Sequence, residues 1–108
     1  MINEKIREAI KQYVEDEGLE EEDLPLLFEN SSFDNSIVGI SHDGRIVYNY
    51  RQMIEEYAAE NECSEEEAQE WIDYNTLRAL PYAGGKAPII MYDLVSDISE
   101  THNGITFN

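Results

Sequence analysis

Apolar side chains recur every three or four residues near the start of the chain, from Ile2 through Ile6 and Ile10 to Val14. Charged side chains fill most of the positions between them, so one face of this segment is apolar and the others are polar. The spacing matches the 3.6-residue period of an amphipathic helix. It predicts a helix over residues 2–17, ending near Gly18, because glycine readily adopts the backbone conformation that closes a helix.

The next segment, residues 18–35, has no regular period. It contains a run of acids, a proline, and several Asn, Ser and Asp residues that favour turns, so it predicts a connector rather than a regular element. Its apolar residues are too many for a free linker, and we expect the segment to fold back onto the core through Leu24, Leu26, Leu27, Phe28 and Phe33.

Two short runs rich in β-branched and aromatic residues, SIVGIS and IVYNY, flank Asp43-Gly44. This dipeptide accommodates the positive φ angles of a tight hairpin turn. The pattern therefore predicts a β-hairpin over residues 36–48.

The helical period returns after the hairpin. Apolar side chains share one face of residues 50–62 at Met53, Ile54, Tyr57 and Ala58, while glutamates lie elsewhere. This segment is predicted to be a second helix.

A third helix is predicted over residues 64–80. Ser64 followed three residues later by Glu67 forms a capping box, in which each side chain bonds the other residue's backbone N–H. The helix is expected to stop by Leu80, because Pro81 disfavours helical geometry in the residue before it.

The run PIIMYDL, residues 88–94, is short, apolar and bounded by residues that break regular structure, which predicts a central strand. Together these elements predict a single α+β domain over residues 1–108, in the order α-β-β-α-α-β. The last strand is expected to join the hairpin in a small sheet packed against about three helices. Its direction of pairing is left open, as is the choice of an edge strand or simple packing for residues 105–107.

The charge of the chain is strongly negative, with 24 acidic against 7 basic residues and a net charge of −17 at pH 7. Such a charge disfavours direct binding to nucleic acid or to an anionic membrane. It is densest over residues 49–75, where nine acids meet one base, Arg51, for a local charge of −8.

An ordered acidic surface of this kind could occupy the basic groove of a nucleic-acid-binding protein. The alternative is that the acids only solubilise the chain and cap its helices. The candidate surface for a basic protein partner comprises Glu55, Glu56, Glu60, Glu66, Glu70, Asp73, Leu77 and Tyr82.

Seven tyrosines and Trp71 form a second enrichment. Large rings with polar tips suit half-buried positions, so they are expected to complete a small core. Alternatively, some of them form an aromatic patch for a protein partner together with Leu77 and Tyr82.

Catalytic and metal-binding patterns are missing from the sequence. Gly84-Gly85-Lys86 lacks the spacing and the following Ser or Thr of a phosphate-binding loop, and the acid runs lack the spacing of a calcium loop. Cys63 is the single cysteine, and neither His42 nor His102 stands in a catalytic or metal-ligand pattern. We therefore expect no enzyme activity, no catalytic residue, no metal and no cofactor.

The segment from Phe33 to Leu94 resembles a family of small acidic proteins of unknown function from gut bacteria of the Firmicutes type, their phages and mobile elements. The resemblance rests on DGRIVYNY, EEAQEWIDYNTLRALPY and APIIMY. It implies a bacterial cytosol and a mobile-element gene, and it carries over no activity. With no apolar run of membrane-spanning length and no signal-peptide pattern, a cytoplasmic location is expected.

These patterns rank three functions. A non-enzymatic acidic protein that binds or inhibits a basic partner comes first. A structural or regulatory module with an aromatic interaction face comes second, and an enzyme acting on a small molecule comes third. The oligomeric state is left open.

Overall fold

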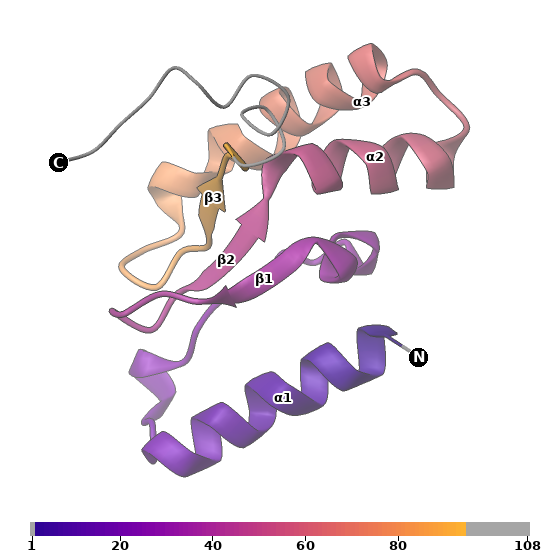
Figure 1. Cartoon of the computed structure of the whole chain (residues 1–108). Helices are drawn as coiled ribbons and strands as arrows, with labels where there is room; N and C mark the ends of the chain where they lie inside the picture. Colours follow the sequence, from indigo (N-terminus) through magenta and orange to yellow (C-terminus); the bar gives the residue numbers. More distant parts are fainter. Residues whose placement is uncertain (1, 95–108) are drawn as a thin grey trace, which may run out of the picture.

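The computed structural model describes residues 2–94 and has an α+β fold (Figure 1). Its three strands form one sheet in the order β1-β2-β3. The elements of the chain are α1 (Ile2–Glu17), η1 (Glu21–Asp23), η2 (Ser31–Ser36), β1 (Ile37–Ile40), β2 (Ile46–Asn49), α2 (Tyr50–Asn61), α3 (Glu65–Trp71), η3 (Ile72–Thr76), η4 (Leu77–Tyr82) and β3 (Ile89–Met91). The proposed strand or packed segment at residues 105–107 lies outside the described residues.

Helix α1 has the predicted bounds, and Gly18 follows it with a φ of 62°. Figure 1 shows α1 on the β1 side of the molecule and the pair α2 and α3 at the opposite end. The short helix η2 contacts both α1 and α2, so it links the two ends of the domain.

The segment that contains η2 was predicted to be an irregular connector, and this was wrong for residues 31–36. The side chain of Asn30 accepts a hydrogen bond from the backbone N–H of Ser32 and caps the helix. Within the segment Phe33 is fully buried, and Leu27 and Phe28 pack against the core, whereas Leu24 and Leu26 remain exposed. The predicted return to the core is thus made by three of its five apolar residues.

The predicted hairpin is confirmed, with β1 and β2 antiparallel and Ile40 opposite Ile46. The turn has one positive φ angle, at Gly44 (80°), and Asp43 has none. The backbone N–H of Ser41 donates to the carbonyl of Arg45 at 2.7 Å, which closes a three-residue loop. This is the longer hairpin loop in which a single glycine takes the left-handed conformation.

Strand β3 pairs parallel to β2, with Val47 opposite Ile89. The prediction of a central final strand was wrong, because among the described residues β3 lies at an edge and β2 is central. Parallel pairing needs a long crossover connection. Here α2, α3, η3 and η4 provide it.

The third helix begins as predicted, with both hydrogen bonds of the capping box between Ser64 and Glu67. It does not continue as one α-helix to residue 80. It ends at Trp71, passes through a wider π-helical turn, η3, and then a tighter 3-10 turn, η4, which contains Pro81 and ends at Tyr82. The predicted stop by Leu80 was wrong because a proline removes one backbone donor, and a short 3-10 segment tolerates that loss.

The core of the domain is aromatic and aliphatic and draws on the connector, the central strand and the helices. Its buried members are Phe33, Ile46, Tyr48, Tyr50, Met53 and Ile72. None of the helices among residues 2–94 is long and apolar enough to cross a membrane.

Candidate functional site

The acidic residues predicted to form a partner surface lie on α2, α3 and η3. Glu55, Glu60, Glu66 and Glu70 are exposed, and Glu56 is half-buried. Within residues 2–94 these five glutamates form no ion pair. Their charge is therefore not neutralised by the described part of the chain.

Helices α2 and α3 pack against each other and carry these glutamates in spaced pairs. Glu56 and Glu60 are four residues apart on α2, and Glu66 and Glu70 are four apart on α3. Side chains at this spacing are neighbours on a helix, with Cβ atoms about 5–6 Å apart, and like charges there repel each other. A cation that bridges either pair would relieve that repulsion.

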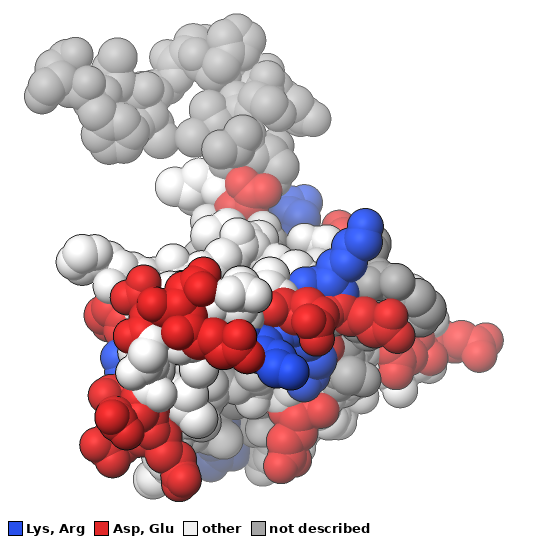
Figure 2. All heavy atoms as spheres, turned by 90° about the horizontal axis from the view of Figure 1, so that it is seen from below, with Lys and Arg blue, Asp and Glu red and all other residues white. Residues whose placement is uncertain are grey.

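The acidic surface is not confined to this helical pair. Figure 2 shows the face that carries α1, where acidic side chains also predominate but basic side chains interrupt them. Between residues 4 and 23 there are nine acids and three bases, Lys5, Arg7 and Lys11. Residues 49–75 have the same number of acids and a single base, so their surface is more uniformly negative.

Asp73 has a partner within the domain, unlike the five glutamates. The hydroxyl group of Tyr50 donates a hydrogen bond to its carboxylate. Burial, followed by the neighbouring Asp73, raises the pKa of Tyr50, whose ring also stacks on that of Tyr92 at 5.0 Å. Asp73 thus fastens η3 to the start of α2, a structural role beside the one predicted for it.

The two apolar members of the predicted surface are placed differently from each other. Leu77 is half-buried and packs against the core, whereas Tyr82 is 90% exposed. Only Tyr82 is therefore fully accessible to a partner.

Sequence reasoning missed an apolar groove of about 520 Å³. One wall comes from the connector, with Leu26, Phe28 and Phe33, and the other comes from Trp71, Ala79 and Leu80. Trp71 is 38% exposed and Leu26 41% exposed, and the Trp71 ring stacks on Tyr57 at 4.6 Å between centroids. The exposed apolar residues of the connector were the signal that could have indicated this groove.

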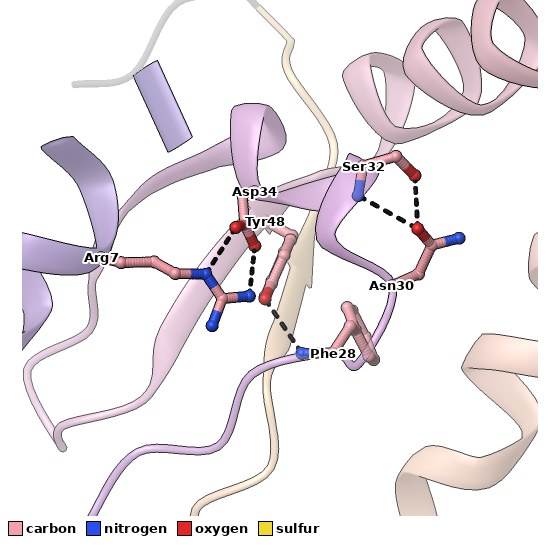
Figure 3. Close-up of polar contacts among 6 residues, drawn as sticks. All are labelled: Arg7, Phe28, Asn30, Ser32, Asp34 and Tyr48. Atoms are coloured by element: carbon pink, nitrogen blue, oxygen red, sulfur yellow. Dashed lines mark hydrogen bonds and ion pairs between the residues drawn. The ribbon is translucent and has the colours of Figure 1, made fainter. Parts of the chain in front are cut away.

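A buried polar network holds the connector wall in place (Figure 3). The backbone N–H of Phe28 donates to the hydroxyl group of Tyr48 at 3.1 Å, and the Phe28 and Tyr48 rings lie 4.7 Å apart. Burial raises the pKa of Tyr48 to about 12, so its hydroxyl stays neutral near pH 7. The Phe28 ring is consequently fixed both by packing and by a backbone hydrogen bond.

The same network ties α1 to η2. The Arg7 guanidinium donates two hydrogen bonds to the Asp34 carboxylate, at 2.7 and 3.1 Å, as Figure 3 shows. This fork geometry holds both side chains in one orientation. The carboxylate and its hydrogen bonds raise the pKa of Arg7.

The loop at Gly84-Gly85-Lys86 has a structural role. The Lys86 ammonium donates to the carbonyl of Asp43 at 2.7 Å, and the Arg45 guanidinium donates to the carbonyl of Ala87 at 2.8 Å. These bonds fasten the hairpin turn to the segment before β3.

Residues 2–94 include no group of three His, Cys, Asp or Glu side chains arranged to hold a metal ion. Cys63 is half-buried and His42 exposed, at separate points of the fold. His102 lies outside the described residues.

No protein-family model, curated protein or solved structure matches this chain significantly. The resemblance to acidic proteins of gut bacteria and their mobile elements therefore stays a prediction.

Proposed function

We propose that this domain binds a basic protein through the acidic surface of α2 and α3, and that it acts by occupying a surface that otherwise receives nucleic acid. The observation that supports this most strongly is the set of glutamates without an ion pair within residues 2–94: Glu55, Glu56, Glu60, Glu66 and Glu70.

The rigidity of the glutamate array supports the proposal. The Ser64–Glu67 capping box fixes the start of α3, and the Tyr50–Asp73 hydrogen bond fastens η3 to α2. A preordered array of charges loses little conformational entropy on binding, which favours association with an equally ordered set of Lys and Arg side chains.

The proposed activity is binding rather than catalysis, in a bacterial cytosol and in the setting of a mobile element. The single cysteine leaves no disulfide to form within the chain and suits a reducing compartment. The second candidate function, an interaction module with an apolar face, is supported by the groove beside Trp71.

A pull-down from bacterial lysate at low and high salt tests the proposal. We expect capture of a basic nucleic-acid-binding protein at low salt and its loss at high salt, because salt screens exposed charges. Replacing Glu56, Glu60, Glu66 and Glu70 with glutamine should abolish the capture.

The matched control neutralises four acids elsewhere: Glu8→Gln, Glu15→Gln, Asp16→Asn and Glu17→Gln, all exposed on α1. Both variants have the same net charge. Equal loss of capture in both would show that net charge alone attracts the partner and would contradict a specific role for α2 and α3.

A further inference from the structure

The apolar groove and the acidic surface adjoin each other on α3. Trp71, which lines the groove, directly follows Glu70 of the acidic surface. The groove volume of about 520 Å³ lies within the range of sites that bury a ligand-sized group. A molecule bound to the glutamates of α3 could therefore reach the groove without leaving the surface.

Acidic residues also border the opposite wall of the groove. Glu29 lines it directly. A second hollow shares Leu26 and Ala83 with the groove and is lined by Glu21 and Glu22. Negative charge thus flanks the apolar groove on both its connector side and its α3 side.

The arrangement matches one kind of occupant. An apolar groove within a negative rim is complementary to a segment with large apolar side chains flanked by lysine or arginine. Interfaces of this type place their tightest contacts in a buried apolar centre and use a charged rim for orientation.

We infer that the groove between the connector and the segment 71–83 receives a large apolar side chain from a cationic amphipathic segment of the partner. This inference rests on the proposed function and adds the chemistry of the contact. The acidic helices attract the partner, and the groove anchors it.

Trp71 is the only tryptophan of the chain, so its fluorescence reports directly on the groove. The probe is a peptide of about 14 residues, or roughly four helical turns, with Lys and Leu at helical spacing. The comparison peptide has the same length and charge, with Gln in place of every Leu. Neither contains an aromatic residue.

We expect the Lys/Leu peptide to bind the full chain about tenfold more tightly than the Lys/Gln peptide, or about 1.4 kcal/mol. Only the Lys/Leu peptide should shift the emission of Trp71 to shorter wavelength, because an apolar side chain displaces water from the ring. The shift should persist at a salt concentration that removes binding of the Lys/Gln peptide.

Ala79→Gln narrows the groove, since Ala79 is exposed and lines it, and Ala59→Gln makes the same change on the exposed face of α2. The tenfold preference and the emission shift should be lost in Ala79→Gln and kept in Ala59→Gln. The comparison of the two peptides on the unaltered chain does not depend on the folding of either variant.

Equal binding of both peptides with no change in Trp71 emission would overturn the inference and leave the proposed function standing. Failure of both peptides to bind would overturn both. A Trp71 response to the apolar dye ANS but to neither peptide would also overturn it and would identify the groove as a small-molecule site.

Discussion

Replacing Arg7 with methionine should destabilise the domain by about 3 kcal/mol. Asp34, whose side chain is 1% exposed, accepts two hydrogen bonds from Arg7, and no other ion pair to it occurs within residues 2–94. Removing one partner of a buried pair costs about 3–5 kcal/mol, because the remaining charge is left uncompensated. The Arg7 side chain is 49% exposed, so water can partly replace it, which places the expected cost at the low end.

Asp34→Asn keeps the shape of the side chain and removes its charge, so its cost should be smaller, about 2 kcal/mol. The double variant should lose about 3 kcal/mol rather than the sum, because without the carboxylate the loss of Arg7 strands no charge. The resulting coupling of about 2 kcal/mol is typical of residues that share one interaction.

Urea unfolding followed by Trp71 fluorescence and by circular dichroism measures these values. Lys11→Met is the matched control, since Lys11 is exposed on the same helix and forms no ion pair among residues 2–94. It should change the free energy of unfolding by less than about 0.5 kcal/mol. A loss for Arg7→Met as small as that of Lys11→Met would refute the view that the ion pair holds α1 to η2.

Three further perturbations test other parts of the fold. Burial raises the pKa of Tyr48 from 10.0 to about 12, so its contribution to stability is complete below pH 10 and is lost as the pH rises through 12. The loss should approach about 3 kcal/mol in urea titrations across that range, and Tyr48→Phe should flatten the curve if the assignment is right. Gly44→Ala should cost about 1–2 kcal/mol because the φ of Gly44 is 80°, whereas Gly39→Ala, at ordinary φ and in open space, should cost little; equal melting temperatures would contradict this. Ser64→Ala should cost about 1 kcal/mol by thermal unfolding through loss of its bond to the backbone of Glu67, and an unchanged stability would show that the capping box contributes nothing.

Local patterns predicted the elements that depend on neighbouring residues. The apolar period of residues 2–17 determines α1 on its own, and the Ser64–Glu67 pair determines where α3 begins. The hairpin likewise follows from Asp43-Gly44 between two β-rich runs, although its loop is one residue longer than the tightest type.

Features set by distant contacts were not predictable in the same way. The parallel pairing of β3 depends on the route of a crossover about 40 residues long, from Val47 to Ile89. Helix η2 forms from Ser, Asp and Asn residues that equally favour turns, and its packing between α1 and α2 decides the outcome. The groove could not be read from either wall alone, because Leu26 and Trp71 belong to separate segments.

The most direct test of the central claim is an NMR titration of the labelled full chain with the Lys/Gln peptide at low salt. If α2 and α3 form the binding surface, the amide signals that move most should belong to residues 55–70, and the movements should vanish in the variant with Glu56, Glu60, Glu66 and Glu70 changed to glutamine. Movements of equal size in α1 and η1 would show that the peptide follows net charge over the whole molecule, and they would contradict the assignment of a partner surface to α2 and α3.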